Sequence, residues 1–174
     1  MEKAYNGRTQ SAEWLEKAIK LKTVILAKID SMPEALRTVA PSPNDWSASG
    51  MVEHLVLLEE NVAGPWRQRL LESPSQKVGI KANLVSRMIS IVFTKTKLRV
   101  PTVPELEPKS EMTSVELKNR WDTARAGLVA ALPNDDRSAW ILHPALGPLS
   151  SEQMGRMIVA HLEHHLHHWP NPKG

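Results

Sequence analysis

The sequence contains no cysteine. This absence excludes disulfide frameworks, thiolate-ligated metal sites and a cysteine nucleophile, and it fits a reducing cytosol. A long apolar run is lacking as well, since the strongest one, Met88–Phe93, is far shorter than the roughly 20 residues that a membrane span requires. The polar segment Met1–Gln10 has no apolar core of the kind found in signal peptides. We therefore expect a cytoplasmic protein that does not enter a membrane.

The chain also lacks a strong charge bias. Its formal net charge is +3 and its pI is about 9.3, with lysine and arginine scattered along the sequence. A segment such as Lys95–Arg99 is interpreted as a solvated basic face, so we expect no nucleic-acid partner. With 174 residues, 41% of them hydrophobic and 24% charged, the composition is typical of one globular domain spanning residues 1–174.

Hydrophobic periodicity predicts four long amphipathic helices. Their expected bounds are Ser11–Ser31, Ser47–Leu71, Ser114–Leu132 and Ser151–Trp169. Each must bury one apolar stripe against the others, so the expected fold class is an all-α four-helix bundle. Pro33 either ends the first helix or starts a short second turn, and Gly64-Pro65 predicts a kink in the second long helix.

The caps and connections are predicted from polar and proline residues. Ser47 or Ser49 can cap the second helix, Thr113 or Ser114 the third with Glu116 as a reciprocal partner, and Ser150 the last with Gln153. Four stretches are predicted as connections: loops at Pro41–Asp45 and Ser73–Asn83, an extended Pro-rich crossing at Val100–Met112, and a turn at His143–Leu149. Leu84–Lys97 suits either a strand or a helix, and its length favours a helix.

Five of the seven histidines lie within His161–His168, on the last predicted helix. Leucine and glutamate interrupt the run, so a purification tag is rejected. At roughly 100° per residue, His161 and His165 lie beside the apolar stripe of this helix and face the core, one turn apart. Buried imidazoles need hydrogen-bond partners or a metal ion. The pair therefore indicates either a metal site or a hydrogen-bonded core.

The remaining histidines supply a third ligand and an alternative site. His54 flanks the apolar stripe of the second long helix and is the best third ligand, although a lone histidine there is more often structural. His143, in the predicted turn, is its rival. His167 is expected to face solvent, and His164 and His168 form a second i, i+4 pair at the helix edge. That pair allows the alternative of a surface cluster with incidental metal affinity.

Other polar and apolar residues are candidates for lining a pocket around the histidines. These are Trp46, Leu58, Asn61 and His168. Trp46 is nevertheless expected to pack beneath the second long helix, and Asn61 can also be read as a polar residue at the helix edge. Glu53, next to His54 in sequence, is about 100° around the helix and is expected to be solvated rather than to act as a general base. No catalytic residue is assigned.

Three motifs together resemble the DinB-like superfamily across nearly the whole chain. They are Trp46-Ser47 followed by His54-Leu55, then His143-Pro144-x-x-Gly147 with Leu149-Ser150, and finally His161-x-x-x-His165. The resemblance implies an up-down-down-up bundle with a long crossover between the second and third helices. It implies a homodimer, and a divalent ion (nickel, zinc, manganese or iron) held by His54, His161 and His165. Some relatives transfer a low-molecular-weight thiol or isomerise a thiol adduct, and others have no known activity.

Three functional hypotheses follow. The first is a metal-dependent enzyme that transfers a low-molecular-weight thiol to, or hydrolyses, a small-molecule substrate, because three neutral histidines leave a coordination position open. The second is a non-catalytic binding or stress-response module on the same scaffold. The third is a structural bundle with hydrogen-bonded core histidines, for which direct His–His hydrogen bonds would speak.

Overall fold

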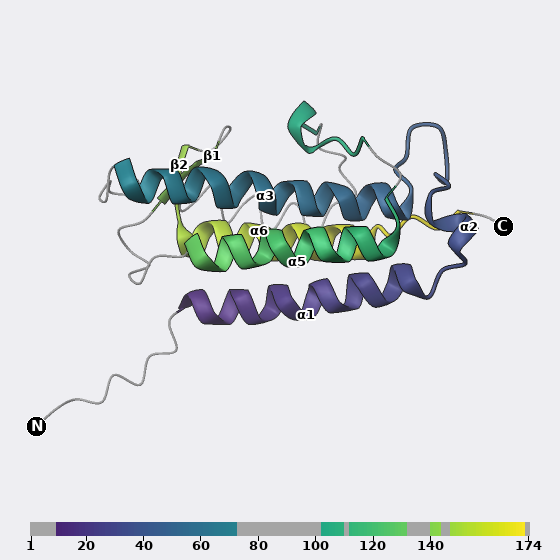
Figure 1. Ribbon diagram of the computed structural model, residues 1–174, viewed down its shortest axis with the longest axis horizontal. Helices are drawn as coiled ribbons and strands as arrows, with labels where there is room; N and C mark the ends of the chain where they lie inside the picture. Colours follow the sequence, from purple (N-terminus) through teal and green to yellow (C-terminus); the bar gives the residue numbers. More distant parts are fainter. Residues whose placement is uncertain (1–9, 73–101, 110–111, 132–139, 144–146, 173–174) are drawn as a thin grey trace, which may run out of the picture.

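The computed structural model describes residues 10–72, 102–109, 112–131, 140–143 and 147–172. Four long helices lie alongside one another in Figure 1. They are α1 (Gln10–Asp30), α3 (Ala48–Glu72), α5 (Ser114–Ala131) and α6 (Ser151–His167). Between them lie the short helix α2 (Glu34–Arg37), the 3-10 helix η1 (Pro104–Leu106), and the strands β1 (Trp140–His143) and β2 (Gly147–Ser150). None of the described helices is both long and apolar enough to cross a bilayer.

The predicted helix bounds are confirmed to within two residues at each end, and so are the predicted caps. Ser47 Oγ accepts the backbone N–H of Gly50 at 3.0 Å at the start of α3. Ser150 and Gln153 form the predicted reciprocal pair at α6, with distances of 3.2 and 2.8 Å. These bonds satisfy backbone groups that the first turn of a helix leaves without partners. The capping residues therefore predict the first residue of each of these helices more closely than the hydrophobic pattern alone does.

The chain is predominantly helical, as expected, but the predicted turn at His143–Leu149 is wrong in part. Residues 140–143 and 147–150 pair as an antiparallel two-stranded sheet, with Trp140 opposite Ser150 and His143 opposite Gly147. Pro148 fits this sheet because a two-stranded ribbon has only edge strands, where a missing N–H is tolerated. The hairpin delivers the fully buried Leu149 to the core immediately before α6 begins.

Of the other predicted connections, those within the described residues can be compared with the structure. Pro41–Asp45 is a loop, and α2 begins directly after Pro33. The Pro-rich crossing contains η1, whose Leu106 carbonyl group contacts His54 near the start of α3. Helix α3 continues through Gly64-Pro65, and the kink expected there stays a prediction. The predictions for Ser73–Asn83 and Leu84–Lys97 lie outside the described residues.

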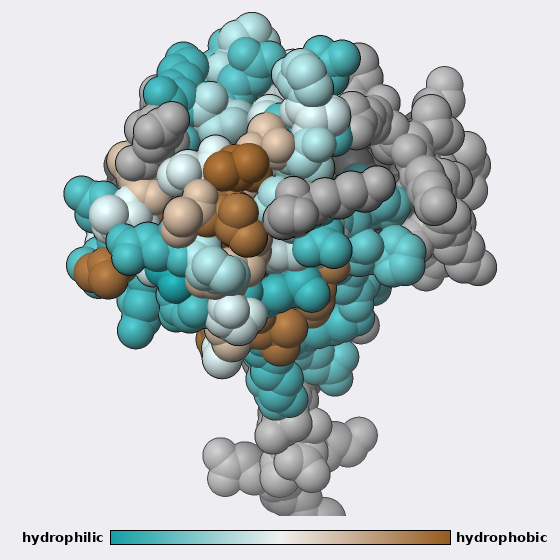
Figure 2. Space-filling view, turned by 90° about the vertical axis from the view of Figure 1, so that its right-hand side faces the viewer, coloured by the Kyte–Doolittle hydropathy of each residue, from teal (hydrophilic) through white to brown (hydrophobic). Residues whose placement is uncertain are grey.

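The long helices pack in two pairs, α3 against α5 and α1 against α6. The buried core between them is apolar. Its largest fully buried side chains include Ile25, Ile29, Met51, Leu55, Leu117, Trp121, Leu128, Ile158 and Leu162. By contrast, the end of the molecule that carries α2 shows a few hydrophobic residues among many hydrophilic ones (Figure 2). The apolar residues thus gather between the helices, as the amphipathic pattern predicts.

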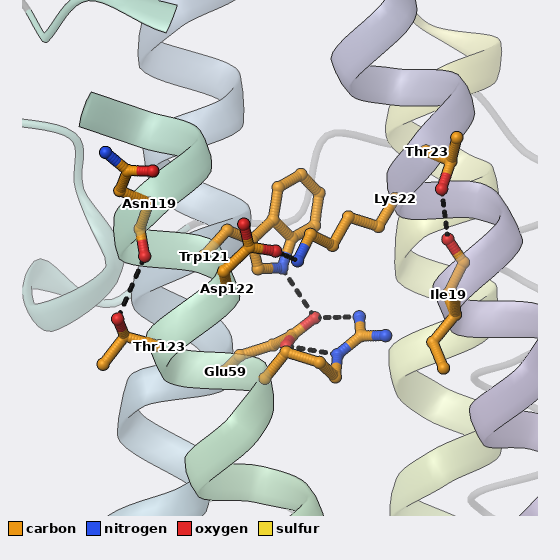
Figure 3. A network of polar contacts seen from close by, with 9 residues as sticks. Ile19, Lys22, Thr23, Glu59, Asn119, Trp121, Asp122 and Thr123 are labelled. Carbon is orange, nitrogen blue, oxygen red and sulfur yellow. Dashed lines mark hydrogen bonds and ion pairs between the residues drawn. The ribbon is translucent and has the colours of Figure 1, made fainter. Parts of the chain in front are cut away.

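A buried polar network ties α3 to α5 (Figure 3). The Glu59 carboxylate is fully buried and accepts hydrogen bonds from Trp121 Nε1 at 2.9 Å and Arg125 Nε at 2.7 Å, and also from Arg125 Nη2. Lys22 of α1 pairs with Asp122 and lies over the Trp121 ring, 5.8 Å from its centroid. A carboxylate buried without such partners would cost several kcal/mol, so these contacts fix how α5 sits on α3.

Removal of one partner of this buried ion pair should cost more than removal of both. Glu59→Leu should lower the free energy of unfolding by about 3–5 kcal/mol, because it leaves the Arg125 guanidinium buried and unpaired. The double variant Glu59→Leu/Arg125→Leu should be more stable than Glu59→Leu, as measured by urea unfolding. Glu60→Leu, at a partly exposed position, is the matched control and should cost less. A double variant as unstable as the sum of its single variants would contradict this account.

Helix α1 approaches α6 closely where Trp14 lies on Gly155. A methyl group at position 155 would overlap the indole ring of Trp14, so only glycine allows this packing. Trp14 is 5% exposed and belongs to the core cluster. Glycine is disfavoured in a helix interior, and its presence here is explained by the close approach of the ring.

Gly155→Ala should therefore destabilise the protein by about 1–3 kcal/mol through overpacking, despite the better helix propensity of alanine. The same substitution at Gly127, at a partly exposed position of α5, should stabilise by up to about 1 kcal/mol. Denaturant midpoints of the two variants provide the comparison. Equal stabilisation by both substitutions would exclude the close packing of Trp14 on Gly155.

Candidate metal centre

Three of the predicted ligands come together where α3 meets α6. His54 lies near the start of α3, and His161 and His165 lie one turn apart near the end of α6. Each offers a ring nitrogen, and the three nitrogens lie within 4.8 Å of one another. The Nε2 atom of His161 is 3.0 Å from Nε2 of His54 and 2.8 Å from Nε2 of His165. His54 is 3% exposed, whereas the other two rings are partly exposed.

A backbone carbonyl group fixes the tautomer of His54. Its Nδ1 lies 2.8 Å from the carbonyl oxygen of Leu106, in η1. A carbonyl oxygen can only accept a hydrogen bond, so Nδ1 carries the proton and Nε2 keeps a lone pair. That lone pair faces Nε2 of His161. Metal-binding histidines are commonly oriented by a hydrogen bond of this kind from the second ring nitrogen.

Hydrogen bonds alone cannot satisfy the three converging nitrogens. The contact between His54 and His161 is a hydrogen bond only if His161 Nε2 carries a proton, because His54 Nε2 has none. A single N–H cannot point at both neighbours, so the contact with His165 then has a poorly aligned donor. If His165 donates to His161 instead, two lone pairs face each other at 3.0 Å. Each proton assignment leaves one of the two contacts unsatisfied.

A divalent cation fits this donor set. It would accept one lone pair from each ring, which removes the conflict among the three nitrogens. A tetrahedral ion about 2.0–2.1 Å from each nitrogen would hold them about 3.3 Å apart. The observed separations of 3.0 and 2.8 Å lie a few tenths of an ångström below that value. Small ring rotations would therefore admit the ion.

The surroundings keep the three rings neutral, which is the form that binds a metal. Desolvation lowers the pKa of His54, although the hydrogen bond to Leu106 opposes this shift. Desolvation lowers the pKa of His161 to about 3, and the neighbouring His54 and His164 contribute. Desolvation is also the largest cause that lowers the pKa of His165, and the four neighbouring histidines contribute. All three rings are therefore neutral at neutral pH, with one proton each.

Trp46 lies against the histidines. Its ring centroid is 4.6 Å from that of His54, with the planes tilted by 36°, and 6.2 Å from that of His165, stacked at 26°. The partly buried indole ring thus touches a ring from each of the two helices. The sequence placed Trp46 both among the pocket candidates and beneath the second long helix, and the structure brings it to the candidate ligands.

The remaining pocket candidates lie in different surroundings. Leu58 is partly buried and packs against the core cluster. The exposed Asn61 side chain donates to the carbonyl oxygen of Leu57, in its own helix, at 2.8 Å. His168 Nδ1 donates to the carbonyl oxygen of His164 at 2.9 Å, at the end of α6. A pocket role for these three residues stays a prediction.

The expectation that Glu53 is solvated is wrong. Its side chain is 4% exposed, and Oε1 lies 3.5 Å from Nη1 of Arg120. Arg120 reaches from α5 and also forms two hydrogen bonds with Glu60, at 2.7 and 2.8 Å. The helical position of Glu53 could not reveal this, because the neutralising charge comes from another helix. Glu53 therefore belongs to the contact between α3 and α5.

One contribution to the site gave no sequence signal. The Leu106 carbonyl is a backbone atom, so no residue type marks it. The segment that carries Leu106 packs beside Gly50, where an added Cβ atom would make an ordinary contact with Pro108 Cγ at 3.5 Å. His143 ends β1 opposite Gly147. Its side chain lies outside the described residues, so its role as a rival ligand stays a prediction.

Comparison with known proteins identifies a family for this chain. The family model described as the DinB superfamily matches residues 22–168, which is most of the chain and includes all three histidines. Searches of curated proteins and of solved structures found no match.

The low histidine pKa values predict acid sensitivity of the metal-free protein. Unfolded histidines have a pKa near 6.5, whereas His161 in the folded state has a pKa of about 3. As the pH falls below about 6.5, the unfolded state takes up protons that the folded state refuses, so the free energy of unfolding falls until about pH 3. In the presence of a chelator, urea unfolding at pH 7.5 and 5 should show a smaller loss for His161→Gln/His165→Gln than for the wild type.

His167→Gln is the control for this experiment, because His167 is exposed on the same helix. It should lose stability with acid as the wild type does. Identical losses in all three proteins would mean that the inward histidines are not held neutral by the fold.

Proposed function

Because this chain belongs to the DinB superfamily, we propose that it is a divalent-metal-dependent enzyme whose ion is held by His54, His161 and His165. The observation that carries the proposal is the convergence of three Nε2 atoms that hydrogen bonds cannot satisfy together. Imidazole ligands suit zinc, nickel and iron, and manganese is a fourth candidate within the family. The chain has no cysteine, so it offers no thiolate ligand, and three neutral imidazole rings can bind a divalent cation without one.

We further propose that the ion serves a reaction rather than a structural role. Three protein ligands leave at least one position for water or substrate, which is typical of catalytic sites. The bound ion would lower the pKa of a water or thiol, or polarise a substrate. The reaction class we favour is the transfer of a low-molecular-weight thiol to a small-molecule substrate, with hydrolysis as the second choice.

In this reaction, the chain's own contribution is to orient the ligands and keep them unprotonated. Leu106 holds the proton of His54 on Nδ1 and so keeps its Nε2 available. Desolvation keeps His161 and His165 neutral at the pH of the cell. The candidate ligands come from two helices of different pairs, so the geometry of the site depends on how the pairs pack together.

A structural bundle without an ion is the second candidate, because the separations between the histidine nitrogens also suit hydrogen bonds. Its weakness is the unsatisfied contact that every proton assignment leaves. A non-catalytic binding or stress-response module would keep the ion but turn over no substrate. Metal content separates the structural bundle from the other two candidates, and thiol-transfer assays separate those two.

The arrangement of the whole chain is part of the proposal. We propose one domain of residues 1–174 with the up-down-down-up helix order, acting as a cytoplasmic homodimer. The helix order is supported by contacts that run in the same direction along α1 and α6, from Trp14 on Gly155 to Lys17 with Glu163. The pair Glu59–Arg125 lies C-terminal to the pair Glu53–Arg120 along both α3 and α5, which supports two helices that run in the same direction. The crossover between α3 and α5 would then span the whole length of the bundle.

Elemental analysis of the tag-free protein tests the metal site. We expect about one divalent ion per chain in the wild type, and loss of that ion in His161→Ala/His165→Ala, because a single remaining imidazole cannot hold it. The matched control is His164→Ala/His168→Ala, which removes the other i, i+4 pair of the same helix and should keep the ion. Chelation should also lower the melting temperature of the wild type, because the ion binds the folded state.

Two results would refute the proposal. One is the absence of bound metal even after reconstitution with zinc, nickel, manganese and iron. The other is loss of metal from the His164→Ala/His168→Ala control alone, which would place the ion at the helix edge.

A further inference from the structure

We propose that Trp46 is a positioning residue of the metal centre. By packing against the rings of His165 and His54, it holds both in the orientation in which their Nε2 lone pairs converge. The inference rests on the proposed function and deepens it. It assigns to a loop residue the orientation of a ligand on a distant helix.

The candidate ligands differ in how their rings are held. His54 is oriented by its hydrogen bond to the Leu106 carbonyl oxygen. His165 has no counterpart in the described part of the chain, where its only hydrogen-bond contact joins its Nε2 to His161. A ligand ring without a partner at its second nitrogen can rotate about the bond that joins it to the side chain. Metal-binding histidines usually have such a partner, so something else must hold this ring.

Aromatic packing supplies that restraint for His165. Trp46 stacks on its face at 26° with centroids 6.2 Å apart, while the ring of His164 meets it edge-on at 85° and 5.2 Å. His161 stacks at 4.7 Å. His54, from α3, also meets the His165 ring, with centroids 5.0 Å apart and planes at 61°. Trp46 lies outside both helices and contacts both rings, with its centroid 4.6 Å from that of His54. Offset-stacked and edge-to-face rings attract each other beyond simple burial, so Trp46 can hold both rings in register.

Hydrogen bonds restrain the chain immediately before and after Trp46. Before it, the N–H of Asp45 donates to the carbonyl oxygen of Ser42 at 3.0 Å, and Ser42 Oγ donates to the Asp45 carboxylate at 2.7 Å. After it, Ser47 caps α3 by accepting the N–H of Gly50. A turn and a helix cap therefore fix the position from which the indole ring projects.

Core packing does not account for Trp46. Its side chain is only partly buried, and it belongs neither to the buried core cluster nor to the partly buried residues packed against that cluster. Trp169 differs in this respect, because it is also partly buried but packs against the core. The two tryptophans therefore form a matched pair, in which only one contacts the candidate ligands.

Cobalt(II) binding by the full-length apoprotein tests the inference, since Co²⁺ reports its coordination through visible absorption. Trp46→Ala should bind Co²⁺ roughly ten- to a hundredfold more weakly than the wild type, with an altered visible spectrum, as for loss of a residue that orients a ligand. Trp46→Phe keeps an aromatic face and should restore the affinity to within a few-fold. Trp169→Ala should bind Co²⁺ as the wild type does, whatever stability it loses. A Trp46→Ala protein with wild-type affinity and spectrum would overturn the inference.

Fluorescence gives a second measurement that does not depend on the folding of Trp46→Ala. Bound Co²⁺ should quench Trp46 in the wild type, so Trp46→Phe should lose part of the metal-dependent quenching while Trp169→Phe keeps it. Equal quenching in the wild type and Trp46→Phe would overturn the inference and leave the proposed metal site intact. Failure of the wild type to bind Co²⁺ or any other divalent ion would instead refute the proposed function, and the inference with it.

Discussion

The hydrogen bond from His54 Nδ1 to the carbonyl oxygen of Leu106 is the constraint on which the rest of the site depends. It assigns the proton of His54 and leaves the lone pair of Nε2 facing Nε2 of His161. Once that proton is assigned, neutral rings cannot satisfy both remaining contacts with hydrogen bonds. The proposal of a cation therefore rests on one backbone acceptor and the valence of imidazole, and not on the number of histidines in the sequence.

The fold places this constraint at the junction of two helix pairs. Helix α3 packs mainly on α5, and α1 mainly on α6, whereas the histidine cluster joins α3 to α6. Buried charged side chains join the first pair, where Glu59 is held by Arg125 and Glu53 lies beside Arg120. Glu53 is adjacent to His54 in the sequence, so the contact between α3 and α5 lies next to the candidate ligand. The packing between the helices thus contributes both to the stability of the fold and to the geometry of the candidate site.

Much of this arrangement could be predicted from the sequence, because helical periodicity and capping residues are local signals. The inward direction of His161 and His165 follows from their positions relative to an apolar stripe, which one helix suffices to define. The remainder depends on contacts between distant segments. The burial of Glu53 requires an arginine on another helix, the role of Leu106 rests on a backbone atom, and Trp46 contacts His165 across more than a hundred residues of sequence. The two-stranded sheet before α6 was not predicted, because each strand is only four residues long and β2 begins with glycine and proline.

The central claim is that the three Nε2 atoms share one ion, and anomalous diffraction from a crystal of the reconstituted protein tests it most directly. Data collected on either side of the absorption edge of the added metal would locate the ion without reference to the protein atoms. The account predicts one anomalous peak about 2.0–2.2 Å from the Nε2 atoms of His54, His161 and His165, with the His54 hydrogen bond to Leu106 retained. A peak at His164 and His168 instead, or three histidines in direct contact with no peak among them, would contradict it.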